Sequence, residues 1–448
     1  MEKTNRFLAL ICAVASIGGF LFGFDMAVIS GVLPLMQAQF SLSPGQEGWL
    51  VSSALVGCII GVAISGALSD KLGRRKLLFA AAILFWGSAL GCGLLDTFSS
   101  IIGARIVAGL GVGIASNIVP LYISEMAPAE RRGRYVTYYQ LAITIGILAA
   151  YISNYGLLSY DGSGALGWGE TWALLFVEQK WRAMFLVGLL PATLFILGLF
   201  FVPESSRWVA QQKEAAEEND QSASKRVSHT TAKGSYNMLF SKAMRRPLLL
   251  GILLPLFSQF CGINAIIYYG PTILKDAGIS MDNSYQSQIL FGAANMLFTF
   301  IAIWKVDQLG RRPLYLIGSF CASLSLILTG VFFYLDNVPG LWILLTVTLF
   351  LASFAFSIGP LKFVVASEIF PTAIRGRALG ISIMVMWVAD AIIGQLTAVM
   401  IRDLGIAYTF WLFGLFCVVV FISVFKLLPE TKGKTLEEIE NFWKKTKS

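Results

Sequence analysis

One acidic side chain, Asp25, lies in the middle of the uncharged apolar stretch between Arg6 and Gln37. A stretch of this length can cross a bilayer as a helix, which takes about 20 residues. A carboxylate at that depth costs on the order of 3 kcal/mol, so we expect Asp25 to have a function, a buried partner, or both. Burial favours the neutral acid and a nearby cation favours the charged one, so an acid balanced between them can exchange a proton. The alternative is a carboxylate that is permanently paired for structure.

Arg105 is the expected partner of Asp25. It lies in the apolar segment GARIVAGLGVGI at 103–114. An arginine at membrane depth is expected to face the interior of a helix bundle and to pair there. The two residues together therefore predict an ion pair inside the membrane.

The composition places these charges in a membrane protein. Of the 448 residues, 56% are hydrophobic and 13% are charged, and the mean hydropathy is +0.72, which excludes a set of soluble domains. The six cysteines fall inside apolar segments without paired ligand spacing, so we expect neither a metal site nor a disulfide scaffold. The net charge of +8 comes from Lys and Arg in short loops. There it orients the protein in the bilayer and does not indicate nucleic-acid binding.

The apolar segments predict an all-α membrane protein with twelve transmembrane helices in two six-helix bundles. We expect an N-terminal bundle over 1–202, a cytoplasmic linker over 203–245, a C-terminal bundle over 246–428 and a cytoplasmic tail over 429–448. The basic loops follow even-numbered spans, so the positive-inside rule predicts that both termini lie in the cytoplasm. We expect the protein in the plasma membrane, such as a bacterial inner membrane. The expected spans are 7–35, 48–69, 76–95, 99–123, 135–158, 182–202, 246–272, 285–305, 314–334, 340–366, 378–400 and 407–428.

Three loop motifs occur twice, in the same order and at the same place in each half. GALSDKLGRRK at 66–76 corresponds to IWKVDQLGRRP at 303–313, and SEMAPAERRGR at 124–134 to SEIFPTAIRGR at 367–377. PESSRW follows the sixth span and PETKGK follows the twelfth. The two halves are therefore predicted to be copies, and a substrate site is expected where two such repeats meet.

These motifs, together with QFCGIN at 259–264, resemble those of the sugar porter family of the major facilitator superfamily over essentially the full length. The family contains bacterial proton-coupled xylose and other monosaccharide carriers and the animal glucose facilitators. The resemblance implies alternating access around a sugar held between the bundles, with a proton as the second partner and no cofactor. It also implies a functional monomer in the lipid bilayer.

For Asp25 and Arg105, the resemblance implies a pair in which protonation of the acid releases the arginine. Passive facilitators carry a neutral residue at the place of Asp25, which favours symport over uniport here. A facilitator with a purely structural pair stays open as the alternative. Some proton-coupled members have a further acid in the sixth span, and 182–202 contains none.

The acids and bases of the repeated loops are expected to form charge-assisted bonds on the cytoplasmic face. In the family such bonds hold the inner gate shut in the outward-open state. The alternative is that these charges only set the topology. The predicted gate residues are Asp70, Arg74, Arg75, Glu125, Arg132, Glu204, Asp307, Arg311, Arg312, Glu368, Arg375 and Glu430.

Amide side chains suit sugar hydroxyls because each amide offers both a donor and an acceptor. The resemblance assigns sugar contacts to four amides in three spans. We also expect three aromatic residues to act as walls or gates of the site. Interhelical hydrogen bonding is the alternative role for such amides. The amides are Gln140, Gln259, Asn264 and Asn295, and the aromatic residues are Tyr268, Tyr269 and Trp387.

The sequence departs from the family at three places in this site. Many members have two consecutive Gln where this chain has Ser258 and Gln259, and Phe363 stands at a Trp position. Lys362 and Asp390, the latter where Asn is usual, add two charges in neighbouring spans. The economical interpretation is that they neutralise each other, because an unpaired charge there is very costly. Alternatively, Lys362 faces the cavity and recognises an acidic or strongly polar substrate, such as a uronate or a polyol.

Other functional classes fit less well. An enzyme is not expected, because the one histidine, His229, lies in the polar linker and no nucleophile and base pair or phosphate loop is recognisable. A sugar sensor derived from a transporter is the more distant alternative. Such sensors usually carry long cytoplasmic extensions.

Overall fold

A computed structural model of the chain describes residues 2–128, 132–161, 173–210, 212–213, 244–335, 338–370, 375–432, 438 and 443. Within its helices, the side chains of residues 2–6, 132–134, 136, 306–307, 363, 367 and 375–377 lie outside the description. The described residues form helices and no strand. Twelve helical stretches among them are long and apolar enough to cross a membrane, which confirms the predicted all-α class with twelve spans.

The first half of the chain supplies six of these stretches. The second stretch begins at a capping box, in which Ser43 and Gln46 exchange hydrogen bonds ahead of the apolar run. Pro44 lies in its first turn. The sixth stretch contains a turn between two shorter helices, α7 and α8. The helices of this half are α1 (Glu2–Phe40), α2 (Pro44–Leu72), α3 (Arg74–Leu94), α4 (Phe98–Met126), α5 (Arg132–Ser159), the π-helical turn η1 (Leu174–Glu178), α7 (Lys180–Leu186) and α8 (Leu189–Phe200).

The second half repeats the six stretches, two of them interrupted. Its first stretch is divided into α11 and α12, and its fourth is divided by a π-helical turn, η3. Breaks of this kind inside apolar helices are typical of functional sites. The helices of this half are α11 (Arg245–Phe260), α12 (Ile263–Asp276), α13 (Met281–Leu309), α14 (Arg311–Tyr334), α15 (Gly340–Ser353), η3 (Phe354–Ile358), α16 (Gly359–Ile369), α17 (Arg375–Asp403) and α18 (Ile406–Leu427).

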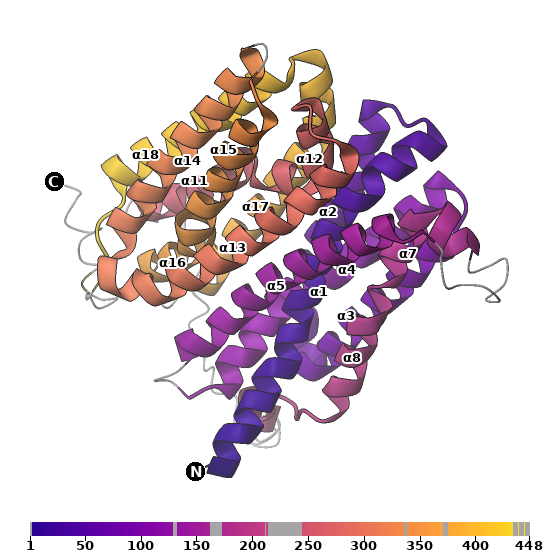
Figure 1. The fold of residues 1–448 in the computed structure, drawn as a ribbon. Coiled ribbons are helices and arrows are strands. Elements are labelled where there is room, and N and C mark those ends of the chain that lie inside the picture. Colours follow the sequence, from indigo (N-terminus) through magenta and orange to yellow (C-terminus); the bar gives the residue numbers. More distant parts are fainter. Residues whose placement is uncertain are drawn as a thin grey trace.

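The two halves lie side by side as separate helix bundles (Figure 1). Along their boundary α2 packs on α17, α5 on α13 and α1 on α12. The predicted linker, 203–245, connects the bundles in sequence, and most of it, 214–243, lies outside the described residues. The division of the chain into these domains therefore stays a prediction at the linker.

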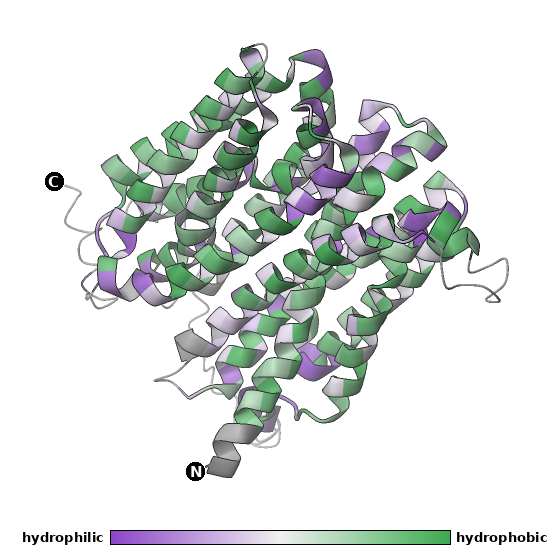
Figure 2. Ribbon diagram, viewed as in Figure 1, coloured by the Kyte–Doolittle hydropathy of each residue, from purple (hydrophilic) through white to green (hydrophobic). Residues whose placement is uncertain are grey.

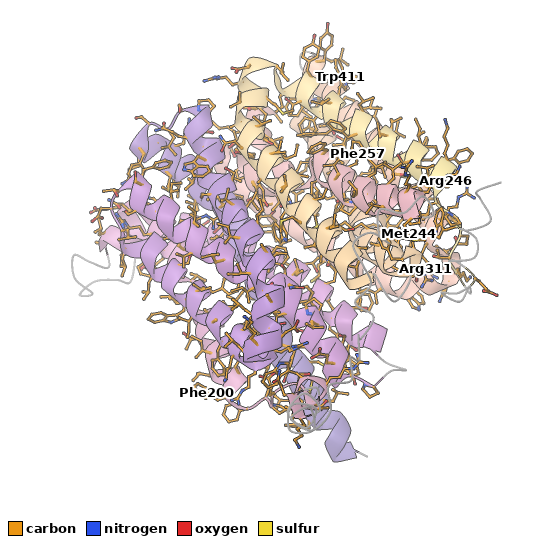
Figure 3. All side chains as sticks on the ribbon, turned by 180° about the vertical axis from the view of Figure 1, so that it is seen from behind. Phe200, Met244, Arg246, Phe257, Arg311 and Trp411 are labelled. Carbon is orange, nitrogen blue, oxygen red and sulfur yellow. The ribbon has the colours of Figure 1, made fainter. Side chains whose placement is uncertain are left out.

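The outer surface of both bundles is apolar. Figure 2 shows hydrophobic residues along most of the helical shafts and hydrophilic residues mainly towards the helix ends. Large apolar side chains are exposed on both halves, as for Phe200, which is labelled in Figure 3 and is 64% exposed. In the second half, Trp304 is 63% exposed. A soluble monomer rarely exposes so much apolar area. The surface therefore fits a bilayer.

Small residues let α1 lie directly against α5. A Cβ added at Gly23 would come 1.9 Å from the backbone oxygen of Ile143, and one at Gly146 would come 2.1 Å from that of Phe20. Close approach of two backbones through glycine is a common way to pack helices in membranes. The run GGFLFG before Asp25 is therefore a packing surface, which fixes the side of α1 that Asp25 occupies.

Replacing Gly23 by Ala is expected to destabilise the protein, because the added methyl group forces α1 and α5 apart. Overpacking of this kind costs about 1–3 kcal/mol. Thermal unfolding of the purified protein in detergent should show a lower melting temperature for Gly23→Ala. The control is Gly66→Ala in α2, where a Cβ meets nothing within 4 Å. An equal response of both variants would contradict the packing argument.

Candidate transport site

A cavity of about 150 Å³ lies at the boundary of the two bundles. Its walls come from α1, α4 and α5 of the first half and from α11, α12, α13, η3, α16 and α17 of the second. Aliphatic side chains make up the apolar part of the lining. The polar and aromatic residues that line it include Phe22, Ser116, Tyr139, Gln140, Thr144, Gln259, Asn264, Tyr268, Asn295, Phe354, Lys362, Trp387 and Asp390.

The break between α11 and α12 brings two amides to this cavity. Gly262 has φ +82°, and a Cβ there would lie 2.3 Å from Phe413, so both the backbone conformation and the space require glycine. The chain turns at this point and continues as α12, which places Gln259 and Asn264 on either side of the break. The Asn264 side-chain amide donates to Gln259 Oε1 at 3.1 Å and to Asp390 Oδ2 at 2.7 Å.

The π-helical turn η3 and the following Gly359-Pro360 set the position of Lys362 on α16. The Lys362 Nζ atom donates to Ser258 Oγ at 3.3 Å, and it lies 5.8 Å from the centre of the Phe354 ring. Ser258 is small enough to leave room for this long side chain. Ser258 and Lys362, two residues that differ from the family pattern, are thus in contact.

Asp390 is held by different groups. Its Oδ2 atom accepts hydrogen bonds from Asn264 and, at 3.4 Å, from the hydroxyl of Tyr268. Its Oδ1 atom has no hydrogen-bond partner among the described residues. The described hydrogen bonds of Lys362 and Asp390 thus go to different neighbours, while the two opposite charges lie in one cavity and attract each other. Their mutual neutralisation stays a prediction.

Most of the residues predicted to contact substrate line this cavity. Two exceptions concern aromatic side chains. Tyr269 is not part of the lining; its hydroxyl donates to the backbone oxygen of Gly394 at 2.9 Å, and the residue is buried in the C-terminal bundle. The side chain of Phe363 lies outside the described residues. The residues that do line the cavity are Gln140, Gln259, Asn264, Tyr268, Asn295, Lys362, Trp387 and Asp390.

Three buried polar atoms in the lining have no hydrogen-bond partner in the described structure. They are the hydroxyl of Tyr139, Nε1 of Trp387 and Oδ1 of Asp390. Buried polar groups nearly always have a partner. Residues that line the cavity thus carry two donors and one acceptor that no described group satisfies.

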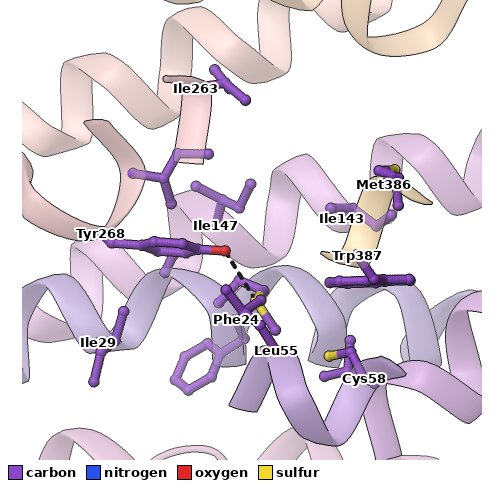
Figure 4. Packing of buried hydrophobic residues seen from close by; sticks show 14 of the residues in the cluster. Phe24, Ile29, Leu55, Cys58, Ile143, Ile147, Ile263, Tyr268, Met386 and Trp387 are labelled. Carbon is purple, nitrogen blue, oxygen red and sulfur yellow. Dashed lines mark hydrogen bonds between the residues drawn. The ribbon is translucent and has the colours of Figure 1, made fainter. Parts of the chain in front are cut away.

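Sequence reasoning missed several lining residues. Phe22 and Met26 lie on the face of α1 that points into the cavity. The Phe22 ring packs against Trp387 with 5.5 Å between ring centres. The Tyr268 hydroxyl, which lies 3.4 Å from Asp390 Oδ2, also lies 3.4 Å from Met26 Sδ, the dashed line in Figure 4. The spacing of Phe22 and Met26 around Asp25 was the available signal. Apolar and aromatic residues at that spacing are equally common in a closed core, so the signal did not single them out.

Asp25 and Arg105 form the expected ion pair. Nη1 of Arg105 lies 3.1 Å from Oδ2 of Asp25, and the arginine is 1% exposed. Asp25 does not line the central cavity; it borders a second space of about 20 Å³ between α1, α3 and α7, beside Ser88 and Phe185. That volume is about enough for one water molecule. The ion pair and the central cavity thus lie on different sides of α1.

The repeated loop motifs form two equivalent networks, one in each half. In the first, Arg74 Nη2 binds Glu125 at 3.0 Å, and Glu204 accepts from the backbone N–H groups of Arg74 and Arg75 at 2.8 and 3.0 Å. Arg74 also contacts Asp70 at 3.3 Å. A carboxylate at the N-terminus of α3 is favourable because the helix exposes N–H groups there.

The second network has the same plan at the start of α14. Arg311 Nη2 binds Glu368 at 3.0 Å, and Glu430 accepts from the backbone N–H groups of Arg311 and Arg312 at 3.1 and 3.0 Å. In the described residues, each network joins helices of its own half, so the expected bonds across an inner gate are not among them. The side chains of three further predicted gate residues, Arg132, Asp307 and Arg375, lie outside the described part.

A group of polar contacts joins the bundles at the opposite end of the helices from the basic loops. Ser52 Oγ donates to Gln395 Oε1 at 2.7 Å, and Gln395 Nε2 donates to the backbone oxygen of Gly45 at 3.0 Å. Nearby, Ser30 Oγ donates to Gln288 Oε1 at 3.1 Å. The bundles are therefore closed against each other at this far end.

Glu430 gives the second network a pH dependence. Partial burial raises the pKa of Glu430, and the backbone N–H groups of Lys432, Arg311, Arg312 and Thr431 together lower it further than burial raises it. The net pKa lies below the usual value of 4.5. A carboxylate with a depressed pKa stabilises the folded state at neutral pH, and this stabilisation disappears as the pH falls through the folded-state pKa.

We therefore expect Glu430→Gln to lower the melting temperature at pH 7, and the difference from the wild type to shrink as the pH approaches 4. Thermal melts across this range measure it. Glu178→Gln, at an exposed position, is the matched control. A difference that stays constant down to pH 4 would contradict the role assigned to the carboxylate.

Comparison with known proteins agrees with this architecture. The family model described as "Sugar (and other) transporter" matches residues 11–443. The arabinose-proton symporter of Bacillus subtilis (strain 168) is 39% identical over 98% of this chain and 95% of that protein. The D-xylose-proton symporter of Escherichia coli (strain K12) is 35% identical over 99% of this chain and 97% of that protein.

Solved structures give the same result. The inward open conformation of the xylose transporter XylE from E. coli superimposes with a TM-score of 0.80 and 35% identity, over 97% of this chain and 100% of that one. A crystal structure of the D-xylose-proton symporter gives 0.79 and 34% over 96% of this chain. The resemblance predicted from the loop motifs is thereby confirmed, and the protein is a transporter rather than an enzyme. The chain belongs to the sugar (and other) transporter family.

Proposed function

We propose that this protein is a proton-coupled monosaccharide symporter that works by alternating access. The observation that carries the proposal is the cavity between the two bundles, which combines amides, aromatic rings and open polar atoms. Its relatives of comparable length are named as symporters of arabinose, xylose and galactose with protons. A pentose or a hexose is therefore the expected substrate class.

The chemistry of the cavity suits a sugar. Gln140 of the first half and Asn295 of the second both line the cavity, and their amides can both donate and accept. The open N–H of Trp387 and O–H of Tyr139 add two donors. The Trp387 ring, packed against Phe22, offers the flat apolar surface that the C–H groups of a sugar need.

The Asp25–Arg105 pair is the proposed site of proton coupling. When Asp25 is protonated its attraction for Arg105 is lost, and a buried arginine without its counter-charge favours another arrangement of the bundle. Phe22 and Met26 on the same helix form part of the cavity wall. Proton and sugar then need only to favour the same conformation for their binding to be coupled.

The proposed orientation places the basic loops in the cytoplasm, since such loops remain on that side of the membrane. Both termini are then cytoplasmic, and the contacts of Gln395 and Gln288 close the outer side. With the outer side closed by these contacts, we infer an inward-facing state. One chain supplies both walls of the cavity, so we propose that the monomer is the functional unit in the plasma membrane.

Asp25→Asn should abolish uphill accumulation and leave sugar exchange intact, because the amide keeps the size of the side chain but cannot exchange the proton. The measurement uses proteoliposomes with an imposed proton gradient, followed by counterflow without one. The control is Asp282→Asn at an exposed position. If wild-type vesicles never concentrate sugar above equilibrium, the protein is a facilitator with a structural ion pair, and the coupling proposal is wrong.

Alternating access requires the outer contacts to open. Cysteines introduced at Ser52 and Gln395, whose side chains lie 2.7 Å apart, should be joined by a short bifunctional thiol reagent. We expect transport to stop when the link forms and to recover when a reducible link is cleaved. The single cysteine variants treated with the same reagent are the controls. Undiminished transport in the cross-linked protein would show that the outer side need not open.

A further inference from the structure

The cavity holds one buried acid and one buried base, and their surroundings differ. Lys362 is 6% and Asp390 2% exposed. The ammonium group of Lys362 already donates to Ser258. The carboxylate of Asp390 uses Oδ2 for Asn264 and Tyr268, while its Oδ1 has no hydrogen-bond partner among the described residues. Oδ1 of Asp390 is therefore a buried acceptor that no described donor satisfies.

An aspartate at position 390 requires a hydrogen-bond donor from the ligand, whereas an asparagine there could bind a donor or an acceptor. An ionised carboxylate accepts hydrogen bonds and donates none, whereas an amide does both. A buried carboxylate oxygen without a donor is unfavourable. A molecule that enters the cavity improves this situation if it brings a hydroxyl group, and makes it worse if it brings a second carboxylate.

We propose that Asp390 determines which sugars bind, an inference that rests on the proposed function. Its Oδ1 atom accepts a hydrogen bond from one hydroxyl group of a neutral sugar. Its carboxylate excludes acidic sugars. Lys362 acts as a positioning residue that balances the charge of Asp390 within the same cavity. The two formal charges cancel, so the cavity offers no net positive charge to a uronate. This proposal is the opposite of the alternative in which Lys362 binds an acidic substrate.

The first test is a scan of deoxy sugars by isothermal titration calorimetry in detergent. The probe is whichever of L-arabinose, D-xylose and D-galactose binds the wild type, together with its mono-deoxy analogues. Asp390→Asn should weaken binding of the parent sugar about 10-fold, as expected for losing a hydrogen bond to a charged group. One analogue, lacking the hydroxyl that Asp390 contacts, should bind the wild type and Asp390→Asn equally. A uniform loss across all analogues would overturn the proposal and leave Asp390 a structural role.

The second test uses D-galacturonate and D-glucuronate. The wild type should bind neither at concentrations that saturate the neutral sugar, a measurement that does not depend on any variant folding. Asp390→Asn leaves the charge of Lys362 uncompensated, so this variant should gain uronate binding, and the double variant Asp390→Asn/Lys362→Met should lose it again. Uronate binding to the wild type as tight as that of the neutral sugar would overturn the proposal, as would a folded Asp390→Asn protein that gains none.

Both tests measure binding without a membrane or a proton gradient. Their failure therefore leaves the transport proposal standing. Conversely, if purified vesicles never accumulate sugar, the coupling mechanism falls while the role of Asp390 in recognition remains open to the same titrations.

Discussion

The structure depends on α1 having two sides that serve different purposes. Asp25 faces Arg105 inside the first bundle, and Phe22 and Met26 face the second bundle across the cavity. Successive helical positions are about 100° apart, so a helix can carry both sides within one turn. Because Gly23 lets α1 lie against the backbone of α5, a shift of α1 is transmitted to α5, whose Gln140 also lines the cavity. A change of charge at one side of α1 can thus reach the sugar site without a direct contact.

The loop networks explain why the bundles can move as units. Each ties the start of its third span to the ends of its fourth and sixth spans through arginine, two glutamates and helix N–H groups. Gly73 and Gly310 have the same φ, +93° and +90°, because each lies against the capping glutamate of its network. Because the same network is present in both halves, the helices of each bundle are held together in the same way. Relative motion is then concentrated at the boundary, where Ser52, Gln395, Ser30 and Gln288 make polar contacts towards one end.

Hydropathy and the duplicated loops were sufficient to predict the twelve spans and the family, because both signals extend over whole helices. Individual side chains were harder. Tyr268 and Tyr269 are neighbours in sequence, yet one lines the cavity and the other binds Gly394, since a step of one residue rotates the direction of a helical side chain by about 100°. Phe22 and Met26 look like core residues in the sequence. Their exposure to a cavity depends on the second bundle, which no local pattern describes.

The charges at 362 and 390 show a further limit of sequence reasoning. Opposite charges in neighbouring spans suggest a pair, but the sequence does not show which groups they bind. Here Lys362 donates a hydrogen bond to Ser258, while Asp390 accepts hydrogen bonds from Asn264 and Tyr268. The two departures from the family also compensate chemically. An amide lost at 258 is replaced by the donor of Lys362, while an amide changed to Asp390 removes a donor and adds an open acceptor. The cavity therefore keeps its capacity to bind hydroxyl groups while its charged acceptor, Asp390, discriminates between neutral and acidic molecules.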